Sequence, residues 1–180
     1  MNEHEIFMRM ALAEARKAEA RGEVPVGAVV VHQGRVIGRG HNGVEHLQDP
    51  TAHAEILAIG AAANALGSWR LENCILYATL EPCAMCAGAL VLARLPLLVF
   101  GAPDPKAGGC GSVNNLIADS RLNHQVACLP GILEAECGSL LQDFFRRLRA
   151  EARVRRVSAG GVAGGEPAGK DGEGPDPDLP

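Results

Sequence analysis

Two short motifs constrain the fold of this chain more than any other feature of its sequence. The first is T-A-H-A-E at residues 51–55, and the second is E-P-C-A-M-C at residues 81–86. Each follows an extended segment and stands where a helix is predicted to begin. The C-x-x-C spacing across a first helical turn brings both sulfurs to one side, where the helix N-terminus stabilises thiolates. The chain is therefore expected to fold so that both motifs reach one ion.

The donor set of these motifs is typical of a catalytic zinc site. His53, Cys83 and Cys86 provide three ligands, which leaves the fourth tetrahedral position for water. Glu55 lies two residues beyond His53 and is placed to accept a proton from that water, whose pKa the metal lowers. The pattern H-x-E followed by P-C-x-x-C is the signature of zinc deaminases that act on nucleobases.

A C-x-x-C pair by itself also fits a redox pair or half of a structural zinc site. The sequence has no second C-x-x-C and no histidine pair that would complete a closed four-ligand site. The remaining cysteines are isolated, which is more typical of buried small hydrophobic residues: Cys74, Cys110, Cys128 and Cys137. The catalytic interpretation therefore accounts for both motifs together.

Hydrophobic periodicity predicts alternating helices and strands. The predicted elements are a helix over 5–20 ending at Gly22, a hairpin of strands 26–31 and 36–38, a helix from 49 to about 66 closed by Gly67, a strand over 74–79, a helix over 83–94 with Pro82 in its first turn, a strand over 97–101, a short helix, a strand over 125–129 and a helix from about 132. This order predicts an α/β fold with three layers, in which helices cover both faces of a sheet of about five strands.

Composition sets the expected domain boundaries. Residues 4–157 are predicted to form one domain, and the Gly/Pro-rich acidic segment 158–180 is predicted to be a disordered tail. Of 17 basic and 21 acidic residues, one and five respectively lie in that segment, so the rest of the chain is balanced. An arginine-rich stretch at 146–156 precedes it and fits either a docking site for a polyanion or an exposed helix face.

The same composition bears on location. No run of about 18 apolar residues is present, so no membrane span is expected. The segment 1–5 is polar and acidic, which is not typical of a secretory signal. We therefore expect a cytoplasmic protein whose cysteines are thiols or metal ligands.

Further blocks of sequence narrow the class of deaminase. They are E-V-P-V-G-A at 23–28, Asn42, D-P-T-A-H-A-E-I at 49–56, T-L-E-P-C-A-M-C-A-G-A at 79–89, V-F-G-A-P-D at 99–104, L-N-H at 122–124, G-I-L at 131–133 and D-F-F-R-R at 143–147. From about residue 5 to residue 150 the chain resembles the bacterial tRNA-specific adenosine deaminases of the cytidine deaminase-like superfamily.

The resemblance implies hydrolytic deamination of adenosine to inosine at the wobble position of an arginine tRNA. It implies a cytidine deaminase-like fold with a mixed sheet, and a homodimer with one Zn²⁺ per subunit whose two subunits both shape each RNA site. It assigns His53, Cys83 and Cys86 to the zinc and proton transfer to Glu55. The substrate residues that it implies are Asn42 for the flipped base, Ala54 beside it, Asp104 for a neighbouring nucleotide, and Asn123 and Phe145 for the anticodon-loop groove.

Other interpretations remain open on the sequence. A small-molecule deaminase of the same superfamily would act on guanine, cytosine or a free nucleoside, and a catalytically inactive module would only bind zinc or RNA. Asn42 and Asp104 also fit turn residues that stabilise their own loops, and one of Phe144 and Phe145 fits core packing. Cys110 and Pro103 depart from the family pattern near Asp104, and the tail has no counterpart in it.

Overall fold

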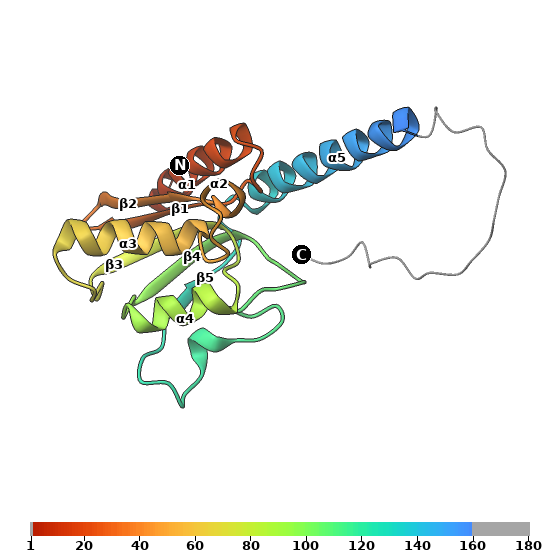
Figure 1. Cartoon of the computed structure of the whole chain (residues 1–180). Coiled ribbons are helices and arrows are strands. Elements are labelled where there is room, and N and C mark those ends of the chain that lie inside the picture. Colours follow the sequence, from red (N-terminus) through yellow and green to blue (C-terminus); the bar gives the residue numbers. More distant parts are fainter. Residues whose placement is uncertain (1, 160–180) are drawn as a thin grey trace. The chain divides into compact units, whose positions relative to one another are not determined.

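One mixed sheet organises the chain (Figure 1). The computed structural model describes residues 2–159, the side chains of 157–159 excepted. The strands are β1 (Gly27–His32), β2 (Arg35–His41), β3 (Cys74–Leu80), β4 (Leu97–Ala102) and β5 (Ala127–Leu129). The helices are α1 (Glu3–Ala20), α2 (Val44–Leu47), α3 (Ala54–Leu66), α4 (Ala84–Leu92) and α5 (Glu134–Ala159), and a 3₁₀ turn, η1, spans Leu116–Ala118.

Strand direction decides where the loops of the sheet gather. The strand order is β2-β1-β3-β4-β5, with β1 antiparallel to both neighbours and β3, β4 and β5 mutually parallel. Because β2 and β3 both run against β1, they run parallel to each other. The carboxyl ends of β2, β3 and β4 therefore meet at one edge of the sheet, which is where ligands bind in open α/β sheets.

Alternate residues of the strands pack into two separate cores, which confirms the predicted three-layer fold. Ala28 and Val30 face the layer formed by α3 and α4. Val29 and Val31 face the opposite layer, formed by α1 and the start of α5. The core residues of β3 and β4 form apolar runs, as expected for strands buried on both faces.

Two glycines of β2 let α3 lie directly on the sheet. A Cβ atom at Gly40 would lie 2.1 Å from the carbonyl oxygen of Ala54, and one at Gly38 would lie 2.2 Å from that of Ala58. Neither contact is possible for a side chain, so only glycine permits this approach. The first turn of α3, which begins one residue after His53, is thereby held against β2.

Both helices that follow the motifs begin later than predicted. The predicted start at residue 49 was wrong because Asp49 Oδ1 accepts bonds from the N–H and hydroxyl of Thr51, at 2.8 and 2.7 Å. This turn competes with helix formation, and α3 begins at Ala54 with His53 as its N-cap. The helix predicted over 83–94 spans 84–92 with Cys83 as its N-cap, so Pro82 precedes the helix instead of occupying its first turn. The short helix α2 was not predicted.

The compact unit that contains the sheet comprises Met1–Arg146, and α5 continues into a second unit, Arg147–Pro180. Helix α5 reaches Ala159, two residues past the predicted end of the domain at residue 157. The rest of that tail, residues 160–180, lies outside the described residues. Between residues 2 and 159, no helix combines the length and apolar character that a membrane span requires.

The close approach of α3 to β2 yields a stability prediction. Gly40→Ala should lower the free energy of unfolding by about 2–3 kcal/mol, because the added methyl group meets backbone atoms that cannot yield locally. Urea unfolding followed by circular dichroism measures this change. The matched control is Gly60→Ala in α3, where a Cβ atom meets nothing within 4 Å. That variant should gain about 0.5–1 kcal/mol from helix propensity, and equal losses in both variants would contradict the packing argument.

Candidate metal centre and active site

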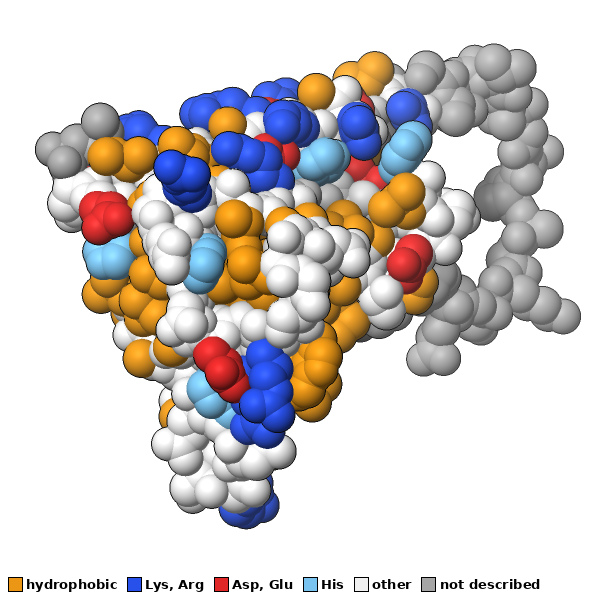
Figure 2. Space-filling model, turned by 90° about the vertical axis from the view of Figure 1, so that its left-hand side faces the viewer, with side chains coloured by type: hydrophobic (Ala, Val, Ile, Leu, Met, Phe, Trp, Pro, Cys, Tyr) orange, Lys and Arg blue, Asp and Glu red, His pale blue; other side chains and the backbone are white. Residues whose placement is uncertain are grey.

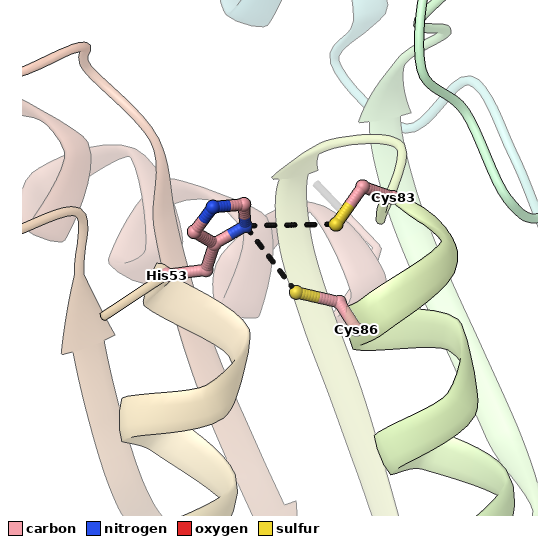
Figure 3. A group of neighbouring side chains, drawn as sticks. All are labelled: His53, Cys83 and Cys86. Atoms are coloured by element: carbon pink, nitrogen blue, oxygen red, sulfur yellow. Dashed lines mark hydrogen bonds between the residues drawn. The ribbon is translucent and has the colours of Figure 1, made fainter. Parts of the chain in front are cut away.

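Three side chains from two helix starts converge at the carboxyl edge of the sheet (Figure 3). His53 precedes α3, Cys83 precedes α4, and Cys86 lies in the first turn of α4. The Nδ1 atom of His53 lies 3.6 Å from the Sγ atom of Cys83 and 3.5 Å from that of Cys86. In the part of the chain that the structure describes, these residues form the one group of three or more His, Cys, Asp or Glu side chains whose ligand atoms all lie within 4.8 Å of one another.

The spacing of these donor atoms fits a tetrahedral metal ion. Zinc binds thiolate sulfur at about 2.3 Å and imidazole nitrogen at about 2.0–2.1 Å, and a tetrahedral angle then separates the two donors by about 3.6 Å. Both nitrogen–sulfur separations match that value. One imidazole and two thiolates also form the soft donor set that zinc prefers. The site residues predicted as ligands are therefore brought together with the required geometry.

Electrostatics favour a thiolate at this site. Hydrogen bonds from Cys86 and His53 lower the pKa of Cys83 to about 3. The pKa of Cys86 is raised, first by its hydrogen bond to Cys83 and then by burial. The hydrogen bond to Cys83 also raises the pKa of His53. Of the two thiols, Cys83 therefore loses its proton more readily, and its position at a helix N-terminus supports the negative charge.

Glu55 lies in the first turn of α3, beside the three ligands. Its side chain is 3% exposed. Burial raises the pKa of its carboxyl group, and a hydrogen bond from its own backbone N–H, the charge of His53 and a hydrogen bond with Cys86 partly offset this rise. A carboxyl group in this environment can hold and release a proton next to the metal ligands.

Asn42 follows β2 and is half-buried near the same edge. Its backbone N–H donates to Val26 at 2.9 Å, and its side-chain amide donates to the carboxylate of Glu23 at 3.4 Å. Glu23 is buried and also accepts the backbone N–H groups of His46 at 2.6 Å and Glu45 at 3.4 Å. The amide of Asn42 is thus oriented by Glu23, which leaves its carbonyl oxygen directed elsewhere.

Asp104 follows β4 and begins a loop that returns to the metal ligands. Its Oδ1 atom accepts the N–H groups of Lys106 at 3.0 Å and Ala107 at 3.2 Å, so the side chain caps its own turn. Gly108 forms an isolated β-bridge with Cys83, which ties the loop to the start of α4.

A buried carboxylate, that of Glu81, lies under this loop. Glu81 accepts hydrogen bonds from the backbone N–H groups of Asp104, Cys110 and Ser112 and from the Ser112 hydroxyl. Burial by itself would raise the pKa of Glu81, but the bonds from Ser112, Asp104 and Cys110 outweigh it and lower the pKa below its usual value. Glu81 is therefore ionised although its side chain is buried.

The other predicted substrate residues lie in three different environments. Ala54 is the first residue of α3 and is fully buried, with its methyl group in the core. Asn123 is exposed, and its carbonyl oxygen accepts a bond from Arg94 at 2.7 Å, beyond the end of α4 that is remote from Cys83. Phe145 on α5 is 40% exposed, whereas Phe144 is 5% exposed and is the member of the pair that packs in the core. Asn123 is thus not brought to the metal ligands of its own chain.

The cysteines outside the site follow expectation with one exception. Cys74, Cys110 and Cys137 are buried, and burial raises the pKa of each thiol. Cys128 was expected to be buried but is exposed, because it lies on the short edge strand β5, which has a neighbour on one side only. Cys110 packs its sulfur 3.7 Å from the carbonyl oxygen of Pro82, close to the metal ligands.

Comparison with known proteins places the chain in a family. The sequence profile of the MafB19-like deaminases matches residues 2–149. The tRNA-specific adenosine deaminase of Bacillus subtilis (strain 168) is 52% identical over 156 residues, which cover 87% of this chain and 97% of the relative. This chain belongs to the tRNA-specific adenosine deaminase family. The resemblance inferred from the sequence is therefore confirmed.

Solved structures support the membership. A structure reported for tRNA:A34 deaminases, which carry out A-to-I editing at the wobble position of transfer RNA, is 47% identical with a TM-score of 0.73 and covers 75% of this chain and 98% of its own. A guanine deaminase from Bacillus subtilis is 43% identical with a TM-score of 0.54, over 57% of this chain and 66% of its own. The deaminase fold is thus shared with a family that acts on a free base.

The sequence alone did not single out Glu23 and Glu81. Both lie inside the blocks that carry the family resemblance, and each stands one or two residues before a proline at the start of an otherwise apolar stretch. A buried carboxylate must find hydrogen-bond donors, so an acidic residue that begins a buried apolar stretch is expected to bind nearby N–H groups. Which loop it binds follows only from the fold.

The convergence of the ligands predicts the effect of removing one. Cys86→Ser should lower metal affinity by more than about 100-fold, because a hydroxyl group does not replace a thiolate at neutral pH. Elemental analysis of the purified protein measures the metal bound per chain. Cys128→Ser is the matched control, since this exposed thiol is not part of the group. If Cys86→Ser bound the metal with wild-type affinity, the assignment of Cys86 as a metal ligand would be contradicted.

Proposed function

We propose that this protein is a zinc-dependent tRNA deaminase that converts adenosine to inosine at the wobble position of an arginine tRNA. The observation that carries the proposal is the position of Glu55 in the helical turn beside His53, Cys83 and Cys86. A purely structural metal site gains little from a buried carboxylate placed to take a proton from water. Family membership supports adenosine in tRNA as the substrate.

In this proposal His53, Cys83 and Cys86 hold the zinc, which as a Lewis acid lowers the pKa of the attacking water. Glu55 accepts a proton from that water and delivers it to N1 of the purine while the water oxygen bonds to C6. Glu55 then transfers the second water proton to the amino group as the C6–N bond breaks. Ammonia leaves, and the carbonyl group of inosine remains.

The substrate is proposed to bind at the carboxyl edge of the sheet. Asn42, oriented by Glu23, bonds the flipped base, and the backbone of Ala54 at the start of α3 offers an N–H without an intrahelical acceptor. Asp104 contacts a neighbouring nucleotide. Asn123, Phe145 and the arginines of α5 bind the rest of the anticodon loop, where stacking and phosphate contacts supply affinity. A loop nucleotide is flipped at low cost because it is not paired in a duplex.

A homodimer with one zinc ion per subunit completes the proposal. Helices α3 and α4 are rich in apolar side chains on their outward faces as well, including Met85 at 37% and Leu92 at 72% exposed. A second copy would cover such a surface. Figure 2 views the molecule from the left-hand side of Figure 1, where hydrophobic side chains lie over the middle of the face and Lys and Arg along its upper edge. The deaminase domain is proposed to comprise residues 4–157, in a cytoplasmic protein.

Guanine is a second candidate substrate, because the fold is shared with a guanine deaminase. The two reactions differ in product, since guanine yields xanthine and tRNA adenosine yields inosine. The expected result is inosine in an anticodon stem-loop and no turnover of free guanine, cytosine or adenosine. Sequencing of the treated RNA and chromatography of the free bases measure these products. Xanthine formation without tRNA inosine would replace the proposed substrate with guanine.

The role of Glu55 is tested by Glu55→Gln. This variant should lose about 10²–10⁴-fold in kcat, because an amide cannot transfer the protons. The bound zinc should remain, since Glu55 is not one of the ligands. Zinc content and single-turnover deamination are measured on the same preparation. Full turnover by Glu55→Gln would remove Glu55 from the mechanism.

A further inference from the structure

The loop that carries Asp104 is held by hydrogen bonds to one buried side chain, that of Glu81. The segment 104–112 leaves β4, passes Gly108 beside Cys83, and returns at Ser112. Each carboxylate oxygen of Glu81 accepts two bonds from it. Oε2 accepts the N–H of Asp104 at 3.0 Å and the Ser112 hydroxyl, and Oε1 accepts the N–H groups of Cys110 at 3.1 Å and Ser112 at 3.0 Å.

The loop packs on this carboxylate without spare space. A Cβ atom at Gly108 would lie 2.4 Å from the carboxyl carbon of Glu81. The N–H of Gly109 also donates to the carbonyl oxygen of Pro82 at 2.8 Å, between Glu81 and the metal ligand Cys83. The segment 104–112 is therefore bonded directly to residues 81–83, which lead from the end of β3 to the metal ligand at the start of α4.

The arrangement leaves one oxygen of Asp104 for a ligand. Its Oδ1 atom is engaged by the N–H groups of Lys106 and Ala107, and its own N–H is held by Glu81. With these three bonds in place, the backbone and the side chain of Asp104 are fixed in one orientation. Loss of the bond to Glu81 would release the backbone while the turn cap persists.

We propose that Glu81 is a positioning residue for substrate binding: its buried carboxylate fixes the segment 104–112 so that Asp104 meets the nucleotide beside the flipped base. The proposal rests on the proposed function, in which Asp104 contacts the RNA. Glu81 itself touches no reacting atom. Its effect is expected in KM for RNA, because a fixed loop loses less conformational freedom on binding than a mobile one.

The variant Glu81→Gln separates the Asp104 bond from the others. With the amide oxygen at the Oε1 position, the N–H groups of Cys110 and Ser112 keep their acceptor. The amide NH₂ then faces the N–H of Asp104, whereas the Ser112 hydroxyl can turn and accept from it. Glu81→Gln therefore removes one anchor and leaves the rest of the loop tied.

Two measurements test the proposal. Amide hydrogen exchange followed by NMR should be about 10- to 100-fold faster at Asp104 in Glu81→Gln, with little change at Cys110. With an anticodon stem-loop as substrate, KM should rise about 10-fold while kcat and zinc content remain. In the Asp104→Ala background, Glu81→Gln should add no further rise in KM, because both changes act through one contact.

Matched variants exclude a general loss of stability. Glu14→Gln makes the same chemical change at a buried carboxylate of α1 that binds Lys17, and it should lower the melting temperature without changing KM. If Glu81→Gln folds poorly, Gly108→Ala is the second variant: its Cβ atom would lie 2.4 Å from the carboxyl carbon of Glu81 and 2.6 Å from the carbonyl oxygen of Asp104, so it should also displace the loop and raise KM.

Unchanged exchange at Asp104 in Glu81→Gln would overturn the anchoring. A loosened loop with wild-type KM, or an undiminished effect in the Asp104→Ala background, would overturn the positioning role. Absence of deamination by the wild-type protein would refute the proposed function instead, and the exchange measurement would still decide whether Glu81 anchors the loop.

Discussion

The parallel direction of β2, β3 and β4 is the constraint on which the site depends. Because β1 runs against both β2 and β3, these two strands end at the same edge of the sheet, and β4 ends there as well. The segments that follow them carry Asn42, the two metal-binding helix starts and Asp104. A register or direction error in β1 would separate His53 from Cys83 and Cys86, although each motif would remain intact along the chain.

Close packing of the helices on the sheet fixes the distances between the candidate ligand atoms. Gly38 and Gly40 allow α3 to lie on β2, which sets the height of His53 above the sheet. The cap positions of His53 and Cys83 place both ligands at helix N-termini, where backbone N–H groups favour negative charge. The resulting nitrogen–sulfur separations of 3.5 and 3.6 Å suit one tetrahedral ion without rearrangement.

Buried carboxylates give the surrounding loops their order. Glu23 binds the amide of Asn42 and the start of α2, and Glu81 binds the segment 104–112. Loops of this kind have few apolar contacts of their own, so their backbone N–H groups need acceptors supplied from the core. A carboxylate serves best because it offers acceptors only, and the converging N–H groups offset the cost of burying its charge.

The sequence by itself predicted every element except α2, the three-layer class and the three side chains that converge as candidate metal ligands, because periodicity and ligand spacing are local properties. It placed the starts of α3 and α4 too early, since the bonds of Asp49 to Thr51 and the extended backbone at Cys83 compete with helix formation. It also left Phe144 and Phe145 undistinguished and missed what Glu23 and Glu81 bind. Those features depend on which segments meet at the sheet edge, and only the tertiary structure decides that. Hydrogen bonds between segments far apart in the sequence produce no regular pattern of residues from which they could be predicted.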